Sequence, residues 1–440
     1  MITTEQRIEA LMKLHPKGYD LSLDRIERLL GKLGDPHTKL PPVLHFAGTN
    51  GKGSTLSFTR AICEAAGLSV HAHTSPHLVN WHERYRMGRE GAPGELVSDE
   101  LLSNTIERVA MANDGQAITV FELMTAVGFL LFSEHPADVC LLEVGLGGRF
   151  DSTNIIPRSA VSIITPVSLD HEAFLGDTIA KIAFEKAGII KRGSRVVIGP
   201  QADEGLAVIE RQARKQGVRP LAFGQHFSAS EQDGRLVFQD EAELLDLPLP
   251  SLPGEHQIEN AGTAICACRE LADVLGIELS EAVIADGLQN TSWPGRMQRM
   301  PAGHLSAHVD TQVDIWLDGG HNPGAAAMLA RQLQKLQGQK PARTVMICGM
   351  LNTKDPKGYF QALSGQVDHI ICVSLLSTDA EIPPAQLSEI AAQCGHRTSV
   401  AENLEAAFVE AQAGGCQRLM VAGSLYLVGD ALRLNGTPPS

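Results

Sequence analysis

The densest group of residues capable of chemistry lies at positions 47–55, which read AGTNGKGST. Glycines let backbone N–H groups turn inward toward phosphate oxygens. A helix that begins after such a loop adds unpaired N–H donors and a favourable dipole. Lys52 supplies a mobile cation for β- and γ-phosphates, and the hydroxyls of Ser54 and Thr55 suit a nearby Mg²⁺. The segment therefore predicts a nucleotide-phosphate site.

This segment departs from the general phosphate-loop pattern G-x-x-x-x-G-K-[ST]. Phe46 stands five positions before Gly51, where the pattern has glycine, and Gly53 separates Lys52 from the hydroxyls. A tight glycine turn between a strand and a helix is the alternative. The nucleotide interpretation is favoured because three glycines, a lysine and two hydroxyls follow a strand, where open α/β sheets bind ligands.

Other polar residues follow later apolar runs. Glu143 ends the run DVCLLEV, where burying an unpaired carboxylate would be costly. It is either a salt-bridge partner of Arg149 or a Mg²⁺ ligand facing the phosphate loop. Asp170 and His171 follow the run AVSIIT. A lone histidine is more often structural than a ligand, but the position of His171 after another strand of the sheet would allow it to converge with Glu143. The local sequence around Lys186 predicts an ordinary helix lysine whose ammonium group is solvated.

Alternating apolar and helical segments must position these residues. The expected strands cover residues 43–47, 69–73, 138–144 and 160–165, and the expected helices cover 54–66, 121–134 and 178–187. Such alternation is typical of a mostly parallel sheet covered on both faces. Residues 219–250, with short alternating segments and turn residues, predict a small antiparallel β insertion. A helix is expected again over 257–275.

The segment Trp293-Pro294-Gly295-Arg296 interrupts this pattern and predicts an interdomain hinge. Beyond it, strands are expected at 315–317, 344–348, 369–373 and 419–422, alternating with helices. The predicted fold class is therefore α/β, with an N-terminal phosphate-loop domain over 1–295 and a Rossmann-like domain over 296–440. A chain of 440 residues is long enough for two or three domains.

The composition excludes several functions. The net charge of −14 argues against a general nucleic-acid or anionic-membrane binder, although a local basic pocket can still bind a small anion. Residues 1–17 lack the apolar core of a secretory signal. The longest apolar stretch, 121–132, is shorter than the roughly 20 residues that span a bilayer. Eight scattered cysteines, with Cys266 and Cys268 the closest pair, are expected to be reduced in the cytoplasm.

Ordered motifs along nearly the whole chain resemble the folylpolyglutamate synthase/dihydrofolate synthase family of the Mur ligase superfamily. A phosphate loop alone would be weak support, whereas many motifs in the same order make an accidental match very improbable. The motifs are LHPKGYDLSLDRI (14–26), HFAGTNGKGST (45–55), TSPHLVNWHERYR (74–86), FELMTA (121–126), LLEVGLGGRFDSTN (141–154), SLDHEAFLGDTIAKIAFEKAGIIK (168–191), PGRMQ (294–298), DGGHNP (318–323) and GMLNTKD (349–355).

The resemblance implies a role for each matching position. ATP would be held by Asn50, Gly51, Lys52, Gly53, Ser54, Thr55, Asn260, Arg296, Asp318 and His321. Mg²⁺, with two sites expected, would be bound by Ser75, Glu143 and His171. Lys186 matches a lysine that becomes carbamylated in this family, a change from cation to anion that would ligand or orient the second metal site. The catalytic set would be Lys52, Lys186 and His171.

The resemblance places dihydropteroate near Tyr19, Asp20, Leu21, Thr119, Phe121, Phe150, Asp151 and Ser152. Phe121 would stack on the pterin and Asp151 would accept its amino hydrogens. Core packing is the alternative for Phe121. In DGGHNP, Gly319 and Gly320 depart from many relatives and have no assigned role. Since the substrates are anions, the basic residues expected near the cleft are Lys52, Arg84, Arg86, Arg149 and Arg296.

The implied activity is ATP-dependent ligation of L-glutamate to dihydropteroate, to reduced folates, or to both, through an acyl phosphate. The first domain would bind ATP and pterin and the second glutamate, in a monomeric cytoplasmic enzyme without nucleic-acid or membrane partners. One alternative is a Mur-type ligase of UDP-sugar substrates, although only 42 residues precede the strand at Val43. The other is an ATP-binding regulator that contains a phosphate loop and has no ligase activity.

Overall fold

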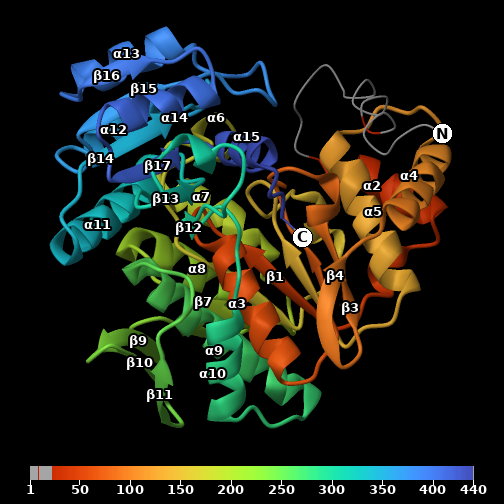
Figure 1. The fold of residues 1–440 in the computed structure, drawn as a ribbon. Helices are drawn as coiled ribbons and strands as arrows, with labels where there is room; N and C mark the ends of the chain where they lie inside the picture. The colour runs from red at the N-terminus through yellow and green to blue at the C-terminus, as the bar shows by residue number, and fades with distance from the viewer. Residues whose placement is uncertain (1–7, 9–21, 440) are drawn as a thin grey trace.

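The computed structural model describes Ile8 and residues 22–439. An eight-stranded sheet of order β4-β3-β2-β5-β1-β6-β7-β8 forms the centre of the N-terminal part (Figure 1). Six of its strands are parallel: β1 (Val43–Ala47), β2 (Val70–His73), β5 (Val139–Glu143), β6 (Val161–Ile164), β7 (Arg195–Ile198) and β8 (Pro220–Ala222). The hairpin β3 (Tyr85–Arg89) and β4 (Ala92–Leu96) adds an antiparallel edge.

Side chains on opposite faces of this sheet enter different apolar clusters, as the period of two in a strand requires. Leu44 and Phe46 of β1 pack with α3, α9 and α10. Cys140 and Leu142 of β5 pack with α2, α4 and α5 on the other face. The helices are α2 (Asp24–Lys32), α3 (Lys52–Ala65), α4 (Asp99–Asn113), α5 (Val120–Glu134), α6 (Glu172–Leu175), α7 (Ile179–Lys186), α8 (Asp203–Gln216), α9 (Glu255–Leu275) and α10 (Glu281–Asn290).

A separate three-stranded antiparallel sheet packs beside α9, at the lower left of Figure 1. It comprises β9 (Phe227–Gln232), β10 (Arg235–Asp240) and β11 (Leu244–Pro248). The predicted β insertion is thus present, but its expected start at 219 is wrong. Residues 220–222 instead form β8, which pairs in parallel with β7 and ends the large sheet.

The C-terminal part has its own six-stranded sheet, at the upper left of Figure 1. Its order is β12 (Gln298–Arg299), β13 (Asp314–Asp318), β17 (Arg418–Ala422), β14 (Thr344–Cys348), β15 (His369–Cys372) and β16 (Thr398–Val400), all parallel except β12. The helices are α11 (Pro323–Gln339), α12 (Pro356–Ala362), α13 (Pro384–Gln393), α14 (Leu404–Ala413) and α15 (Leu425–Asn435). Two apolar clusters lie on its two faces.

The predicted two-domain α/β fold is therefore confirmed, while a boundary at residues 295–296 stays a prediction. Short 3-10 helices complete the fold: η1 (Pro36–Thr38), η2 (Trp81–Arg84), η3 (Ser152–Ile155), η4 (Ala187–Ile189) and η5 (Ser306–His308). Across Ile8 and residues 22–439, no helix combines the length and apolar character needed to cross a bilayer.

Close packing joins the predicted hinge to both domains. A Cβ atom at Gly53 of α3 would come within 2.5 Å of the Trp293 ring, so the indole lies directly against the start of this helix. Gly295 has a positive φ of 74°, and a Cβ there would meet both Leu78 and Val428 of α15 within 3.4 Å. The segment between the two sheets is consequently anchored at the edge of the site described next.

Candidate active site

The predicted phosphate loop connects β1 to α3 and ends at the N-terminus of that helix. Gly51, its N-cap, has φ +83° and no side chain to occupy the first N–H groups of α3, which remain available to an anion. Added Cβ atoms would lie 1.9 Å from the Thr165 hydroxyl at Gly48 and 2.5 Å from the Asn260 side-chain oxygen at Gly51. Two of the loop glycines are therefore required by packing and backbone conformation together.

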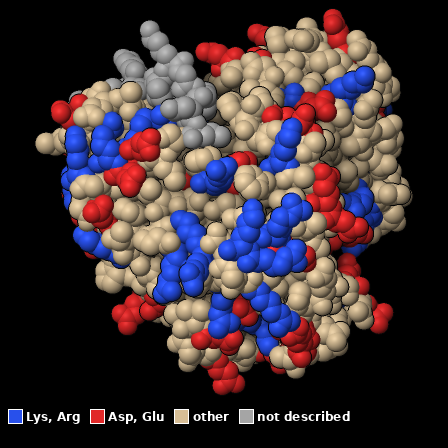
Figure 2. Space-filling view, turned by 180° about the vertical axis from the view of Figure 1, so that it is seen from behind, with Lys and Arg blue, Asp and Glu red and all other residues tan. Residues whose placement is uncertain are grey.

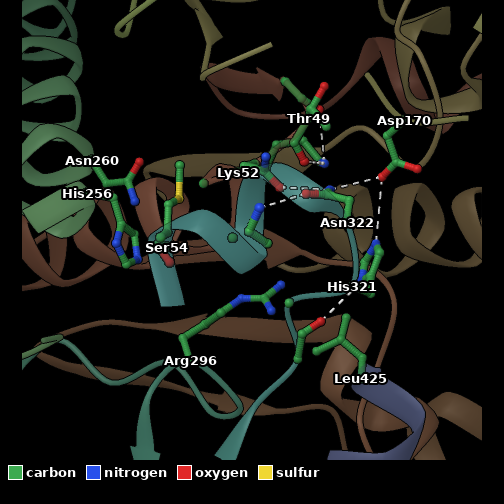
Figure 3. Close-up of a pocket in the computed structure, with 18 of the residues that line it drawn as sticks. Thr49, Lys52, Ser54, Asp170, His256, Asn260, Arg296, His321, Asn322 and Leu425 are labelled. Atoms are coloured by element: carbon green, nitrogen blue, oxygen red, sulfur yellow. Dashed lines mark hydrogen bonds and ion pairs between the residues drawn. The ribbon is translucent and has the colours of Figure 1, made fainter. Parts of the chain in front are cut away.

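A cavity of about 180 Å³ lies in front of this loop, with both domains in its walls (Figure 3). Most of the predicted nucleotide, metal and catalytic residues meet there: Asn50, Gly51, Lys52, Gly53, Ser54, Ser75, Glu143, His171, Lys186, Asn260, Arg296, Asp318 and His321. Thr55 is the exception, since it is fully buried and its hydroxyl lies 3.4 Å from the Asn260 side-chain oxygen.

Two lysines approach the phosphate loop from different elements. The Lys52 ammonium donates to the Gly48 carbonyl at 3.1 Å, and the Lys186 ammonium donates to the same carbonyl at 2.8 Å. Lys186 is only 5% exposed, so the expectation of a solvated helix lysine is wrong. Burial, and then the charge of Lys52, lower the pKa of Lys186 to about 7. Burial also lowers the pKa of Lys52, against the attraction of Glu143.

Glu143 faces the loop and is free of the alternative salt bridge. Its carboxylate accepts a hydrogen bond from the Ser75 backbone N–H at 3.1 Å, whereas Arg149 pairs with Glu185 at 3.7 Å. Burial raises the pKa of Glu143, and the charge of Lys52 partly opposes this. An unneutralised carboxylate at the end of a parallel strand, facing a phosphate site, is suited to a hard cation.

His171 adds a neutral imidazole to this wall. Burial, and then the charge of Lys354, lower its pKa to about 4. Near neutral pH one ring nitrogen therefore carries a proton and the other has a free lone pair. In the part of the chain that the structure describes, no three His, Cys, Asp or Glu residues form a ready metal cluster. Mg²⁺ is commonly bound through one or two protein carboxylates together with substrate phosphates and water. The set of Ser75, Glu143 and His171 fits that kind of shared site.

The second domain contributes the strip of residues 318–322, which begins at the last residue of β13. Asp318 is fixed by backbone donors, from Met297 at 3.0 Å and Gly320 at 2.8 Å. The two glycines that had no assigned role are explained by packing. A Cβ at Gly319 would lie 2.1 Å from Leu425, and one at Gly320 would lie 2.8 Å from Asp318.

Three residues of the predicted pterin site, Tyr19, Asp20 and Leu21, lie outside the described residues. The remaining ones surround the loop after β5 without lining the 180 Å³ cavity. Thr119 caps α5 by accepting from the Glu122 N–H at 3.1 Å, and the Phe121 ring covers Gly145. Both Asp151 oxygens accept hydrogen bonds within their own loop, from Leu146 and Thr153.

Ser152 is also internally bonded, since its hydroxyl lies 2.7 Å from that of Thr125. Phe150 is 36% exposed and packs under the Arg149 guanidinium, 4.6 Å from the ring centre. The Phe121 ring therefore lies behind Gly145, which lines the cavity, and one face of the Phe150 ring is covered by Arg149. Asp151 is instead held as a clamp of its loop, which the sequence did not suggest.

A second cavity, of about 300 Å³, adjoins the first and shares Gly53, Ser75, Pro76, Glu143, Arg296 and Leu425 with it. Its other walls include Leu56, Arg60, Arg86 and Trp293. Arg86 and Arg296 therefore fulfil the expectation of cations near the cleft. Arg84 instead stacks on Trp81, 4.6 Å from the ring centre, outside both cavities.

Sequence reasoning missed the role of Asp170. Its carboxylate faces three residues of the second domain, among them Asn322 and His321 (Figure 3). Burial disfavours ionisation of Asp170, but hydrogen bonding to His321 and the charge of Lys354 outweigh it and hold the pKa well below its usual value. Lys354 lies within the motif GMLNTKD, which indicated that this segment matters in the family. The motif could not show that Lys354 pairs with Asp170.

Charge is distributed unevenly over the outer surface. On the face opposite the view of Figure 1, Lys and Arg gather toward the middle and Asp and Glu lie mainly near the margins (Figure 2). The net charge of −14 is therefore a sum over patches of both signs.

A phosphate loop that faces a second α/β domain across a shared cavity defines a Mur-type ATP-dependent ligase. The chain matches the Mur ligase middle domain over residues 46–268 and the dihydrofolate synthetase C-terminal domain over residues 302–434. Dihydrofolate synthase/folylpolyglutamate synthase of Haemophilus influenzae is 34% identical over 383 residues, or 83% of this chain and 81% of that protein. The Escherichia coli protein of the same name is 32% identical over 96% of this chain and 93% of its own.

Solved structures agree with these sequence matches. Escherichia coli FolC in complex with DHPP and ADP has a TM-score of 0.87 at 30% identity, covering 98% of this chain and 97% of that one. A bifunctional folylpolyglutamate synthase/dihydrofolate synthase with Mn, AMPPNP and L-glutamate bound has a TM-score of 0.82, also at 30% identity and covering 97% of each chain. The chain belongs to the folylpolyglutamate synthase/dihydrofolate synthase family, and the predicted class of ATP-dependent ligase is confirmed.

Proposed function

We propose that the protein joins L-glutamate to dihydropteroate, to reduced folates, or to both, with ATP and Mg²⁺. The observation that carries this proposal is the single cavity in which the phosphate loop, Glu143, Lys186 and residues 318–322 of the second domain meet. Solved relatives hold DHPP and ADP in one case, and Mn, AMPPNP and L-glutamate in another, so nucleotides, a divalent metal ion and the amino acid itself have been observed in such proteins.

The first chemical step activates a poor acylating group. An oxygen of the substrate carboxylate attacks the γ-phosphorus of ATP, the bond from that phosphorus to the β-γ bridging oxygen breaks, and ADP leaves with an acyl phosphate formed. Two anions must approach each other, so the Lys52 ammonium and the free N–H groups of α3 are placed to offset that repulsion. Mg²⁺ bound beside Ser75, Glu143 and His171 would neutralise charge on the phosphoryl oxygens.

In the second step the amino nitrogen of L-glutamate attacks the acyl carbon, the carbon–oxygen bond to phosphate breaks, and the amine loses a proton. The amide and inorganic phosphate are the products. Water competes with the amine, so closure of the second domain over the cavity would both align the amine and exclude water. The hydrogen-bonded strip from Asp318 to Asn322 forms the second-domain wall of the cavity that this closure would seal.

We propose that Lys186 acts as a carbamate. Its low pKa supplies the neutral amine that reacts with CO₂, giving an N-carboxylate and a proton. The product would be an anion beside Lys52, which turns a repulsion between two ammonium groups into an attraction. Such an anion would orient the second metal ion or Lys52 itself.

Several finer assignments belong to the same proposal. We expect a monomer, with the domain boundary near residues 295–296 and the glutamate side on the second domain. A cytoplasmic location is supported by the cysteines, all eight of which are free thiols, seven of them buried. Nucleic acid is not expected as a partner, because the recognised ligands are small anions. The family membership favours folate substrates over UDP-sugars.

A substrate panel tests the proposal. Purified enzyme is incubated with ATP, Mg²⁺ and labelled glutamate, and with dihydropteroate, a reduced monoglutamyl folate or a UDP-linked Mur substrate as the acid. We expect labelled product and stoichiometric phosphate with one or both folate-type acids. Product only with the UDP-linked acid would support the Mur alternative, and ATP hydrolysis that never depends on glutamate would support the regulator.

A further inference from the structure

One carboxylate of the first domain, that of Asp170, lies within 4 Å of three side chains of the second domain. Asp170 accepts from the Lys354 ammonium at 2.9 Å and from the Asn322 amide at 3.2 Å, and His321 lies 3.7 Å away. The side chains of Asp170 and Lys354 are only 11% and 6% exposed. This is a buried ion pair between residues 184 positions apart in the sequence. Asp170 lies in the loop between β6 and α6, and Lys354 lies in the loop between β14 and α12.

The same cluster reaches the phosphate loop. The Asn322 amide that donates to Asp170 also donates to the Asn50 side-chain oxygen at 3.1 Å. Asn50 in turn donates to the Ser168 hydroxyl at 3.1 Å, close in sequence to Asp170. The Asn322 side-chain oxygen meanwhile accepts from the Ala325 N–H at 2.8 Å and caps α11. A rigid helix terminus is therefore connected directly to the loop that receives ATP (Figure 3).

We propose that Asp170 and Lys354 form an interdomain lock that holds the two domains in the arrangement that completes the reaction centre, so that both are positioning residues. This role rests on the proposed ligase function and adds to it a physical means of closure. The lock suits a transient contact because an ion pair that separates can be hydrated on both sides. An apolar contact such as that of Leu78 with the apolar cluster of the second domain has no such alternative partner and is better suited to a permanent pivot.

The pairing predicts a characteristic pattern of mutational effects. Replacing one partner leaves the other charged, buried and unpaired, which is more damaging than removing both. We therefore expect Asp170→Asn and Lys354→Met each to lower kcat by about tenfold or more, and the double variant to lose much less than the product of the two losses. Lys354→Arg should recover most of the activity.

The experiment measures kinetics and domain arrangement on the same full-length variants. ATP, acid and glutamate are varied in turn, and small-angle X-ray scattering is recorded with and without ADP and Mg²⁺. Lys335→Met is the matched control, because Lys335 of α11 pairs at 3.1 Å with Glu231 of β9, also between the two parts of the chain, but with exposures of 43% and 34%. The control should keep wild-type kinetics and scattering, while each single lock variant should scatter as a more open molecule.

Two results would overturn the lock. One is multiplicative loss in the double variant with unchanged scattering in every variant. The other is a rise in KM confined to glutamate for Lys354→Met with wild-type scattering, which would place Lys354 in the amino-acid site. Circular dichroism and thermal unfolding identify any variant that fails to fold, and Lys354→Arg then provides the comparison. Scattering tests the lock even if the enzyme ligates none of the acids in the panel, so the two proposals fail separately.

Discussion

The environment of Lys186 leads to a quantitative prediction about carbamylation. Burial and the neighbouring Lys52 lower its pKa from 10.5 to about 7. At about pH 7.5 roughly three quarters of this amine is neutral, against about one thousandth for an ordinary lysine, a gain of about 750-fold in the reactive form. We therefore expect CO₂ to modify Lys186 selectively, and the modification to be lost as pH falls through 7 and the amine becomes protonated.

Carbon-13 NMR in buffer equilibrated with labelled CO₂ is the direct assay. A carbamate signal should appear in the wild type and be absent from Lys186→Gln. Lys191 provides a matched control, because burial lowers its pKa to about 8 and its ammonium donates to the Asn154 carbonyl at 2.6 Å. Lys191→Gln should keep the signal, since Lys191 has no neighbouring Lys52 to stabilise the product. Addition of a small carboxylic acid should partly restore the activity of Lys186→Ala.

The same pKa has a consequence for stability in CO₂-free buffer. Below pH 7 Lys186 is charged in both the folded and the unfolded chain, and the folded state carries the full penalty, an upper value of about 5 kcal/mol. That penalty falls as pH rises from 7 toward 10.5 and vanishes above it. Lys186→Met should therefore unfold at a higher temperature than the wild type at pH 6, with the difference shrinking by pH 10. A carbamate signal that survives in Lys186→Gln, or full activity in rigorously CO₂-free buffer, would refute the reasoning.

Three further substitutions test the rest of the site. Lys52→Ala should lower ATP-dependent phosphate release by about 100-fold or more, and near-normal glutamate ligation would contradict the phosphate-loop assignment. Gly51→Ala places a Cβ 2.5 Å from Asn260 and should weaken ADP binding in a calorimetric titration, whereas Gly67→Ala, at φ +82° with nothing within 4 Å, should bind normally. Glu143→Gln keeps the size of the side chain and removes its charge. We expect the unfolding temperature to stay at the wild-type value and the Mg²⁺ concentration needed for half-maximal activity to rise. An unchanged Mg²⁺ concentration for half-maximal activity would remove Glu143 from the metal site.

The region around the phosphate loop could be predicted because its signals are local. An apolar run, a glycine-rich turn and a helical pattern specify β1 and α3 without reference to the rest of the chain. The helix begins at Lys52, two residues before the predicted Ser54, because Gly51 takes the left-handed conformation and serves as the N-cap. The pattern of apolar residues cannot show that detail.

The hairpin of β3 and β4 was not predicted, for a reason visible in its sequence. YRMGR and APGEL contain Gly, Pro and charged residues in place of alternating apolar ones, and most of their side chains are partly or fully exposed. These strands form the edge of the sheet, where the backbone pairing with β2 decides the structure. Pairing between distant segments leaves little trace in the local sequence.

The lysines show the same limit within the site. Lys186 occupies a short helix whose neighbours Lys181 and Glu185 are more exposed, and no periodicity marks it as the buried one. Its environment is set by contact with the Gly48 carbonyl, 138 positions away. Lys354 and Asp170 are likewise brought together only by the docking of two domains. The family resemblance singled out Lys186, and the structure shows its buried position against the Gly48 carbonyl.

An acidic protein can bind three anionic substrates because two of the three carboxylates among the described residues that line the cavity, Asp170 and Asp318, already have partners, and the third, Glu143, faces the proposed Mg²⁺ site. Asp318 accepts two backbone N–H groups, which stabilise its charge, and the charge of Asp170 is neutralised by Lys354. Lys52 and Arg296 line the same cavity, and among the described residues neither has a carboxylate within 4 Å. These two cations and the start of α3 therefore supply the positive field that ATP and the acid meet, and Glu143 is the carboxylate that opposes it until a cation binds there. The overall charge of −14 acts at distances that salt screens.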